Sequence, residues 1–500
     1  MASTVAKIWA FADDTPDRIA VTSGDRRLTY AQLREQIARS AARLAELGVA
    51  EGDRVVFIAP SIPEFVITYY GLQTLGAVGI TMNVMSTAPE IDYVLHDSGT
   101  SMVIAWHECA ENARRSAESA GVPFVEIGPY ETADDLPDPV PSYVDRTDDD
   151  ISVILYTSGT TGRPKGAALT VGNINACPVA FKTLMAVTPE DRWATGLPLF
   201  HVFGQAVVMN GALSQGCSLS LINPFVPTKL LDLLRDEQIT IACGVPTMWN
   251  AMLQVAEGYS PDDFTALRLG GSGGAALPAE VIREFEETFG CTVLEGYGLT
   301  ETCGVATFHD VNGHPVVGTV GPAVPGSRVE VRDPDGQVLD TDVVGEIFIQ
   351  GPTVMKEYWN RPDATAAELV DGWFKTGDLG AIDAAGNVRI VDRVKDLIIR
   401  GGYNVYPREV EEVLYTHPDI VEAAVIGVPD AHYGEEIAAV IAPKPGVVID
   451  PDTLRAWAKE RLSAYKVPRI YQFVDALPKG ATGKILKRAI DREGLGASVR

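Results

Sequence analysis

Short apolar strands alternate with helical patterns near the start of the chain, and this alternation most constrains the fold. A helical pattern over residues 28–48 is followed by an apolar strand at 53–59, a second helical pattern at 63–77 and an apolar strand at 101–106. Strands separated by helices in this way are typical of α/β units with a parallel sheet. We therefore expect an α/β fold with parallel or mixed sheets.

The length of the chain indicates more than one domain. At roughly 150 residues per domain, a chain of 500 residues holds about two to four units that can each bury a core. Residues 130–150 are rich in Asp and Pro and are expected to form a loop. Residues 325–350 are expected to form β-hairpins around the turn Asp333–Gly336.

Acidic residues outnumber basic ones, and the imbalance is confined to one part of the chain. The 41 Lys+Arg and 67 Asp+Glu give a net charge of −26, which argues against general affinity for nucleic acid or anionic membrane. Residues 393–500 carry a net charge of +1, whereas residues 1–392 carry −27. This step predicts a large N-terminal domain of several subdomains at 1–392 and a small C-terminal α/β domain, of α+β type, at 393–500. The elements expected in the small domain are helices at 407–417 and 451–462 and strands at 421–428 and 436–443.

Cysteine usage and the apolar profile indicate a cytoplasmic protein. The six cysteines are scattered, without a CxxC pair or a compact Cys/His cluster, which is typical of a reducing compartment. The N-terminal residues show no apolar stretch after a basic region, so no secretory signal is expected. The most membrane-like window, residues 69–85, is interrupted by Gln73, Asn83 and three glycines and falls short of the ~20 apolar residues that a membrane span needs.

A loop rich in glycine and hydroxyl residues, 156–166, directly follows an apolar strand. Gly159 and Gly162 allow a tight turn, so that successive backbone N–H groups can cradle a phosphate beside the charge of Lys165. The loop is not a Walker A motif, because Pro164 stands where that motif has its second glycine. A flexible surface loop is the alternative, which the unbroken run of hydroxyl and glycine residues disfavours.

A second glycine cluster, Gly271 to Ala276, precedes a helical pattern that begins near Pro278. With Glu295 about 20 residues further on, the spacing G-x-G-x-x-A is compatible with a dinucleotide-binding turn. The pattern is short enough to arise by chance and lies in mid-chain. We therefore favour a glycine-lined wall against which a flat adenine ring packs.

The segment 295–301 offers groups suited to a nucleotide and its metal ion. Its glycines allow a close approach of the backbone, and Tyr297 offers an aromatic face. Thr300 and Glu301 offer oxygen ligands, and one carboxylate beside phosphates is the usual way in which proteins hold Mg²⁺. The alternative for these two residues is a helix cap.

Three charged residues further along the chain complete the set. Asp378 is suited to accept hydrogen bonds from the hydroxyls of a ribose, with Arg393 as its companion. Lys484 lies on a glycine loop near the C-terminus. Taken alone, Lys484 would be interpreted as a solvated surface charge.

Seven motifs, in this order, resemble those of the acyl-adenylate-forming superfamily, which groups acyl-CoA synthetases, nonribosomal-peptide adenylation domains and firefly luciferase. The resemblance covers nearly the whole chain, and the segment LPLFHVFGQ looks most like medium- or long-chain fatty-acid–CoA ligases. The motifs are YTSGTTGRPKG (156–166), LPLFHVFG (197–204), GYGLTE (296–301), GEI…GP (345–352), TGD (376–378), DRVKDLIIRGGYNVYPREVE (392–411) and PKGATGK (478–484).

The resemblance implies an AMP-forming acid–thiol ligase that works in two half-reactions. A carboxylate first attacks the α-phosphorus of ATP in the presence of Mg²⁺ and gives acyl-AMP and pyrophosphate. The thiol of coenzyme A then displaces AMP and gives the thioester. The resemblance also implies a mobile C-terminal domain that rotates about Lys395 between the two steps. Homodimer formation is a further open expectation.

The resemblance also implies roles for individual residues. The β- and γ-phosphates of ATP are assigned to Thr157, Ser158, Gly159, Thr160, Thr161 and Lys165. The adenine site is assigned to Gly273, Gly274, Ala275 and Tyr297, and Glu295 and Gly296 are assigned to ATP or AMP binding. The remaining assignments are Asp378 and Arg393 to the ribose, Thr300 to the α-phosphate, Glu301 to Mg²⁺, Lys484 to the substrate carboxylate and phosphate oxygens, and Gly401 and Gly402 to CoA.

The acyl pocket is expected beside His201, which matches an aromatic gate in the family, although it could also be an ordinary core histidine. The other expected wall residues are Phe203, Val207, Met248, Gly271, Cys303 and Val305. These residues include no Arg or Lys for a second carboxylate and no Asp for an amino group, which argues against dicarboxylates and amino acids. A fatty acid is the expected substrate, and an aryl or bulky polycyclic acid is the alternative. For Cys303, a core-lining thiol is favoured over a nucleophile.

Two other functions compete with a CoA ligase. One is an adenylating enzyme that loads a carrier protein instead of CoA. The other is a nucleotide-binding regulatory module without catalysis. The presence of Lys484, Glu301 and Asp378 together disfavours the regulatory module.

Overall fold

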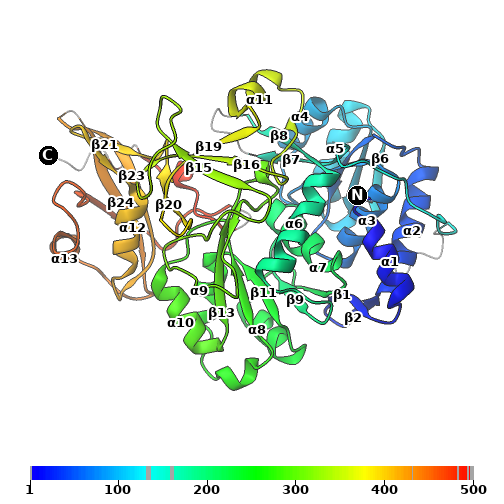
Figure 1. The fold of residues 1–500 in the computed structure, drawn as a ribbon, viewed down its shortest axis with the longest axis horizontal. Coiled ribbons are helices and arrows are strands. Elements are labelled where there is room, and N and C mark those ends of the chain that lie inside the picture. The colour runs from blue at the N-terminus through cyan, green and yellow to red at the C-terminus, as the bar shows by residue number, and fades with distance from the viewer. Residues whose placement is uncertain are drawn as a thin grey trace.

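The computed structural model describes residues 3–130, 137–157, 163–430, 432–480, 483–492 and 495. Within this part of the chain the strands form four sheets, three from residues 19–393 and one from residues 398–473. In Figure 1 the first three sheets and their helices occupy the right and the centre, and the fourth lies at the left with the C-terminus. The predicted class, with mixed sheets in a large N-terminal region and a small C-terminal α/β domain, is confirmed.

A seven-stranded sheet contains the α/β unit predicted from residues 28–106. Five of its strands are parallel neighbours, and two antiparallel strands extend one edge. In spatial order the strands are β17 (Glu357–Tyr358), β8 (Lys165–Thr170), β7 (Ile151–Thr157), β4 (Val78–Met82), β3 (Arg54–Ile58), β5 (Met102–Trp106) and β6 (Phe124–Ile127). The helices of this region are α1 (Ala6–Asp14), α2 (Tyr30–Glu46), α3 (Pro63–Thr74), α4 (Ala88–Ser98) and α5 (Ala110–Ala120).

Local sequence explains where the first of these helices begin. Thr29 accepts a hydrogen bond from the backbone N–H of Gln32 and thereby caps α2, while the Gln32 side chain reaches back to Thr29. Pro63 occupies the first turn of α3, where its missing N–H costs nothing. Every residue of α3 is buried, so this helix lies inside the N-terminal region instead of covering its surface.

An eight-stranded sheet carries the second glycine cluster on a central strand. In spatial order its strands are β14 (Thr307–Phe308), β13 (Thr292–Tyr297), β12 (Leu269–Ser272), β11 (Ile241–Gly244), β9 (Arg192–Thr195), β10 (Ser218–Leu221), β1 (Ile19–Ser23) and β2 (Arg26–Thr29). Only β14 and β2, at the two edges of this sheet, pair with their neighbours in antiparallel fashion. The helices between these strands are α6 (Val171–Leu184), α7 (Asn210–Leu213), α8 (Pro227–Asp236), α9 (Pro246–Leu253) and α10 (Ala279–Phe289).

A third sheet is antiparallel and contains the predicted hairpin. The turn is closed by the N–H of Gly336, which donates to the carbonyl of Asp333 at 3.0 Å, and φ of Gly336 is +82°. The described part of the predicted loop, residues 137–150, contains no helix or strand. The strands of the third sheet are β15 (Arg328–Arg332), β16 (Gly345–Gln350), β19 (Trp373–Ile382), β18 (Leu369–Val370) and β20 (Val388–Arg393), and α11 (Pro362–Glu368) precedes β18.

The fourth sheet and its helices form the C-terminal domain. Its strands are β22 (Tyr403–Val405), β21 (Ile398–Arg400), β24 (Gly434–Pro443), β23 (Ile420–Asp430) and β25 (Ile470–Phe473), and its helices are α12 (Pro407–Tyr415) and α13 (Pro451–Lys459). Two hydrophobic clusters within residues 398–495 give this domain its own core.

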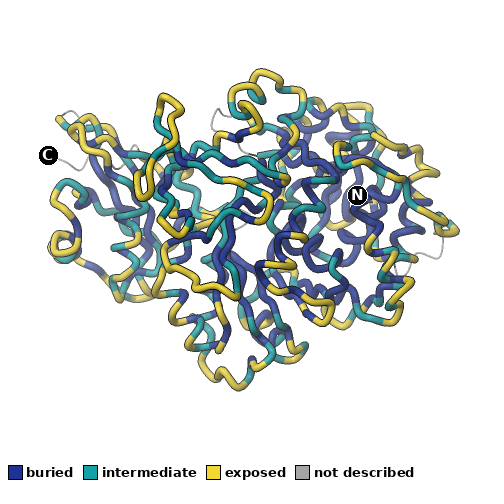
Figure 2. Tube along the Cα trace, in the orientation of Figure 1, coloured by how far each residue is buried: buried dark blue, intermediate teal, exposed yellow. Residues whose placement is uncertain are grey.

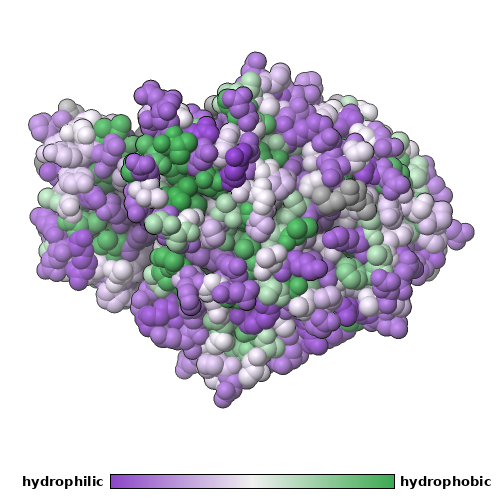
Figure 3. Space-filling view, viewed as in Figure 1, coloured by the Kyte–Doolittle hydropathy of each residue, from purple (hydrophilic) through white to green (hydrophobic). Residues whose placement is uncertain are grey.

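Burial follows the sheets and the helices between them, while loops and helix surfaces are exposed (Figure 2). Hydrophilic residues cover most of the face in Figure 3, as the net charge of −26 leads one to expect. Among the described residues, no helix is both long enough and apolar enough to cross a membrane.

Candidate active site

The predicted site residues lie at the ends of strands from different sheets. Thr157 ends β7, Ser272 ends β12 and Tyr297 ends β13. In open α/β sheets the carboxyl ends of the strands are where ligands bind. Thr157 Oγ1 lies 3.4 Å from a carboxylate oxygen of Glu301, which follows β13, so the ends of two different sheets meet here.

The glycine wall forms where β12 ends. A β-carbon at Gly273 would lie 3.4 Å from the ring of Phe203 and 3.5 Å from the carbonyl oxygen of Gly296, so the backbone approaches both groups closely. Gly274, with φ of +80°, adopts a conformation that favours glycine. Gly274 and Ala275 are exposed and are therefore free to face a ligand.

Glu295 supports this wall from β13. Its Oε1 accepts a hydrogen bond from the backbone N–H of Leu277 at 3.1 Å, just beyond the glycines. Burial raises the pKa of Glu295 to about 7, which the hydrogen bond from Leu277 opposes only in part. Glu295 therefore holds the segment that follows the glycines, and its part in ATP or AMP binding stays a prediction.

Asp378 on β19 receives two donors at once. The hydroxyl of Tyr297 donates to Oδ2 at 2.5 Å, and Nε of Arg393 lies 2.9 Å from Oδ1. The Asp378 side chain is almost fully buried, and each carboxylate oxygen keeps a second lone pair. The arrangement brings together three residues that the sequence analysis assigned to the nucleoside.

Glu301 and Lys165 belong to one hydrogen-bonded chain of side chains. Nζ of Lys165 lies 2.6 Å from Oε1 of Glu368 and 4.1 Å from the centre of the Tyr358 ring. The Tyr358 hydroxyl lies 2.7 Å from Oε2 of Glu368 and 2.9 Å from Oε1 of Glu301. Burial raises the pKa of Glu301, the nearby Glu368 adds to this effect, and Lys165 opposes it.

Glu301 fits the chemistry of a Mg²⁺ ligand. Its carboxylate is a hard oxygen donor beside the hydroxyl of Thr157. The described residues contain no group of three or more His, Cys, Asp and Glu that could enclose a metal ion by itself. A Mg²⁺ ion held by one carboxylate together with phosphate oxygens does not need such a group.

Lys484 reaches the N-terminal region from the C-terminal domain. A β-carbon at the preceding Gly483 would lie 2.6 Å from Oγ1 of Thr247 on α9, so the glycine loop rests against that helix. Burial lowers the pKa of the Lys484 ammonium and the positive charge of Arg393 lowers it further, while Asp378 opposes both. The charges of Asp378 and Arg393 therefore act on Lys484.

His201 stands near Lys484 and is neutral at physiological pH. Burial, together with the charge of Lys484, lowers the pKa of His201 to about 4. Its Nδ1 accepts a hydrogen bond from the backbone N–H of Phe203 at 3.3 Å, which places the ring proton on Nε2. His201 precedes a π-helical segment, Phe203–Met209, and such segments occur frequently at functional sites.

The predicted acyl-pocket residues lie in the N-terminal core. Phe203 contacts the glycine wall, and Val207 lies against Gly304, where a β-carbon would be 2.9 Å from Val207 Cγ2. Gly271 instead faces Cys243 and Met185. Val207, Met248, Cys303 and Val305 are all buried. Burial raises the pKa of the Cys303 thiol to about 12, which agrees with a structural thiol and not with a nucleophile.

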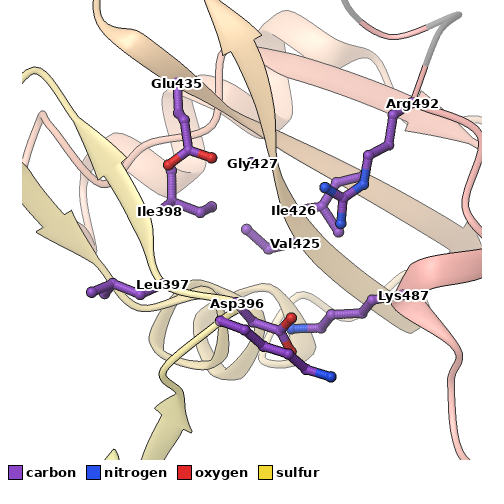
Figure 4. Close-up of a pocket in the computed structure, with 10 residues that line it drawn as sticks. Asp396, Leu397, Ile398, Val425, Ile426, Gly427, Glu435, Lys487 and Arg492 are labelled. Atoms are coloured by element: carbon purple, nitrogen blue, oxygen red, sulfur yellow. The ribbon is translucent and has the colours of Figure 1, made fainter. Parts of the chain in front are cut away.

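The remaining predicted residues lie away from this set or cannot be placed. Ser158, Gly159, Thr160 and Thr161 fall outside the described residues. Gly401 and Gly402 form an exposed turn between β21 and β22, with φ of +57° and +85°. Lys395 lines a cleft within the C-terminal domain, together with Asp396, Val425 and Lys487 (Figure 4).

Sequence reasoning missed two members of the site. Tyr358 and Glu368 connect Lys165 with Glu301. They come from β17 and α11, about 200 residues after Lys165 in the chain. Neither lies in a glycine-rich or repeated pattern, so only the tertiary structure brings them to the site. Asp392, which joins β20 to the start of α12, and Lys487, which pairs with Glu411, were missed in the same way.

This fold and this group of side chains define an adenylate-forming enzyme, and comparison with known proteins agrees. The chain belongs to the AMP-binding enzyme family: the model of that family matches residues 8–359, and the model of the AMP-binding enzyme C-terminal domain matches residues 409–484. It is an acid–thiol ligase of the AMP-forming acyl-CoA synthetase type.

Individual relatives cover almost the whole chain. The chain is 40% identical to a feruloyl-CoA synthase of Amycolatopsis sp over 484 residues, which is 96% of each protein. It is 35% identical to a long-chain-fatty-acid–CoA ligase of Bacillus subtilis, covering 96% of this chain and 92% of that protein. The crystal structure of ATP-bound MatB from Rhodopseudomonas palustris superposes with a TM-score of 0.92 at 34% identity and covers 99% of both chains.

Proposed function

We propose that the protein is an ATP-dependent carboxylic acid–CoA ligase that forms acyl-AMP and then acyl-CoA from an acid with an apolar tail. One observation carries the proposal: the glycine loop of Lys484, from the C-terminal domain, rests against Thr247 of the N-terminal region, and the charges of Asp378 and Arg393 act on the Lys484 ammonium. A lysine brought by one domain to a nucleoside site on another is suited to a reaction between a carboxylate and a phosphate.

In the first half-reaction, a carboxylate oxygen of the acid forms a bond to the α-phosphorus of ATP, and the bond from that phosphorus to the bridging oxygen breaks. Pyrophosphate leaves with the bond electrons. Asp378 and Arg393 position the ribose, and the glycine wall holds adenine. Lys484 neutralises the charge that gathers on the carboxylate and α-phosphate oxygens. Catalysis therefore rests on positioning and charge neutralisation.

The phosphates require a rearrangement around Lys165. In the described structure its ammonium is paired with Glu368, so phosphate oxygens must take the place of this carboxylate. Glu301, with the neighbouring hydroxyl of Thr157, would hold Mg²⁺, which supplies charge neutralisation to the phosphates when bound. Thr300, the residue before Glu301, is the proposed contact to the α-phosphate.

In the second half-reaction, the sulfur of CoA attacks the acyl carbon, the bond between that carbon and the AMP oxygen breaks, and the thiol proton passes to solvent. We propose a boundary at residues 392/393 and a rotation of the C-terminal domain about Lys395. This rotation would withdraw Lys484 and bring the exposed turn at Gly401 and Gly402 toward the pantetheine chain.

The acid is proposed to be a medium- or long-chain fatty acid. The proposed pocket is lined by Phe203, Val207, Met248 and other apolar residues, and its polar neighbour His201 is neutral. A second candidate is an aryl acid of the hydroxycinnamic type, since the chain is 40% identical to a feruloyl-CoA synthase and 35% identical to a fatty-acid–CoA ligase.

A comparison of rates with the two classes of acid decides the substrate. Dodecanoic acid and ferulic acid are supplied separately with ATP, Mg²⁺ and CoA, and kcat/KM is measured from AMP release. The fatty-acid assignment predicts the larger kcat/KM for dodecanoic acid. A larger kcat/KM for ferulic acid would overturn the fatty-acid assignment in favour of the aryl acid. Pyrophosphate exchange without CoA-dependent AMP release would indicate that the enzyme loads a carrier protein instead of CoA.

A further inference from the structure

A largely buried cluster of charges joins the hinge to the segment that carries Lys484 (Figure 4). Lys487 lies three residues after Lys484, and its Nζ is 2.7 Å from Oε1 of Glu411 on α12. Burial lowers the pKa of Lys487, but the carboxylates around it outweigh burial and raise that pKa. Besides Glu411, these carboxylates are Asp392 and Asp396, on either side of Lys395.

Asp392 connects this cluster to the N-terminal region. It lies on β20, opposite Leu379 of β19, and therefore belongs to the third sheet. Its Oδ2 accepts a hydrogen bond from the backbone N–H of Arg408 at 2.9 Å. Arg408 lies in the first turn of α12, whose N-cap residue Tyr406 provides no side-chain cap. A carboxylate at this position satisfies an unpaired N–H and opposes the positive end of the helix dipole.

A second contact fixes the same helix end on β20. Nη1 of Arg408 donates to the carbonyl oxygen of Ile390 at 2.7 Å. The start of α12 is thus held by β20, and one turn further along, Glu411 holds Lys487. A continuous path of contacts therefore runs from β20 through α12 to the loop of Lys484.

The position of the hinge makes this path specific to one domain arrangement. In the chain, Asp392 lies before Lys395, whereas Arg408 and Lys487 lie after it. A rotation at Lys395 therefore moves Arg408 and Lys487 away from Asp392. The pair of Lys487 with Glu411 lies wholly within the C-terminal domain and survives the rotation. The contacts of Arg408 with Asp392 and with Ile390 must be broken.

We propose that Asp392 on β20, the start of α12 and the Glu411–Lys487 pair form a latch that holds the C-terminal domain in the arrangement for adenylate formation, which makes Lys487 a positioning residue for the first half-reaction. The latch rests on the two-step function proposed above. Lys484 provides charge to the reacting groups, whereas Lys487 keeps the segment of Lys484 in place.

The first test separates the two half-reactions. The variants are Lys487→Gln and Asp392→Asn, with Lys487→Arg to restore the charge and Lys479→Gln as a matched control. Lys479 lies on the same segment and pairs with Glu422 inside the C-terminal domain, away from the hinge. Pyrophosphate exchange measures the first step, and AMP release from pre-formed acyl-AMP with CoA measures the second.

Loss of one charge-assisted contact is expected to slow pyrophosphate exchange by about tenfold or more in both test variants. Thioester formation from acyl-AMP should stay within about twofold of the wild type, because that step does not use the latched arrangement. Lys487→Arg should recover most of the exchange rate, and Lys479→Gln should leave both steps unchanged. Equal losses in both half-reactions, or no loss in either, would overturn the latch.

The second test measures the domain arrangement without any substrate. Spin labels on Lys229→Cys in α8 and Lys459→Cys in α13, both exposed positions, report the distance between the two domains. A Cys109→Ser background is used, because the other five cysteines are buried. Asp392→Ala, which removes the acceptor of the Arg408 backbone N–H, should broaden the distance distribution and add a second population, and an unchanged distribution would refute the latch. If the wild type catalyses neither half-reaction, the proposed function fails, while the distances still decide the latch.

Discussion

Removal of the Lys484 ammonium should separate the two half-reactions. The charge lies in a partly desolvated site, since burial and Arg393 together lower its pKa. At an effective dielectric constant of about 20, a unit charge about 4 Å from a phosphate oxygen contributes about 4 kcal/mol. Lys484→Ala should therefore slow adenylate formation by about 10²- to 10³-fold, since water replaces part of the lost interaction.

The assay compares pyrophosphate exchange with thioester formation from pre-formed acyl-AMP in the same variant. The second rate should stay within about threefold of the wild type, because the proposed rotation withdraws Lys484 before that step. Lys479→Ala, on the same segment, serves as the control and should leave both rates unchanged. An equal fall of both rates in Lys484→Ala would refute the role assigned to this residue.

Three further perturbations test other parts of the mechanism. Lys395→Pro, which stiffens the hinge, should slow thioester formation more than pyrophosphate exchange, and an unaffected second step would remove the rotation. Asp378→Ala should raise KM for ATP by about tenfold or more, because both Tyr297 and Arg393 lose their common acceptor, and an unchanged KM in initial-rate kinetics would remove Asp378 from the ribose site. The pKa of His201 is lowered from 6.5 to about 4 on folding, so the unfolded state binds the proton more tightly and stability falls as the pH drops below about 6.5. His201→Gln should therefore reduce the loss of unfolding free energy between pH 7 and pH 5 by about 2 kcal/mol in urea titrations, whereas an equal loss in both proteins would contradict the neutral, buried histidine.

Much of the fold could be predicted because its signals are local. The capping box of Thr29 and Gln32, the proline at the start of α3 and the turn at Asp333–Gly336 each define an element within a few residues. The glycine wall could also be predicted, since the backbone favours glycine at Gly274, where φ is +80°, and leaves no room for a β-carbon at Gly296.

The contacts between distant segments could not be predicted in this way. Glu368 pairs with Lys165 across 203 positions of the chain, and nothing near either residue marks the other. Asp392 lies inside a motif that the sequence analysis used, yet its partner Arg408 is defined by how α12 rests on β20. Residue types predict the chemistry of this site, whereas the fold decides which charges meet.

The net charge of the chain constrains how the protein binds ATP and CoA. A protein with a net charge of −26 cannot attract ATP and CoA by its overall field, so positive charge must be supplied locally. Lys165 is paired with Glu368 and Arg393 with Asp378. With the proposed boundary at residues 392/393, Arg393 and Lys484 are both cations that the C-terminal domain contributes to the site.

The central claim is that this chain joins an apolar carboxylic acid to CoA at the expense of ATP. The most direct test incubates the purified protein with ATP, Mg²⁺, CoA and a panel of fatty and aryl acids, and follows AMP release together with the mass of the thioester. The account predicts stoichiometric AMP and acyl-CoA, both dependent on the acid and on CoA. Release of ADP in place of AMP, or AMP release without a thioester when CoA is present, would contradict it.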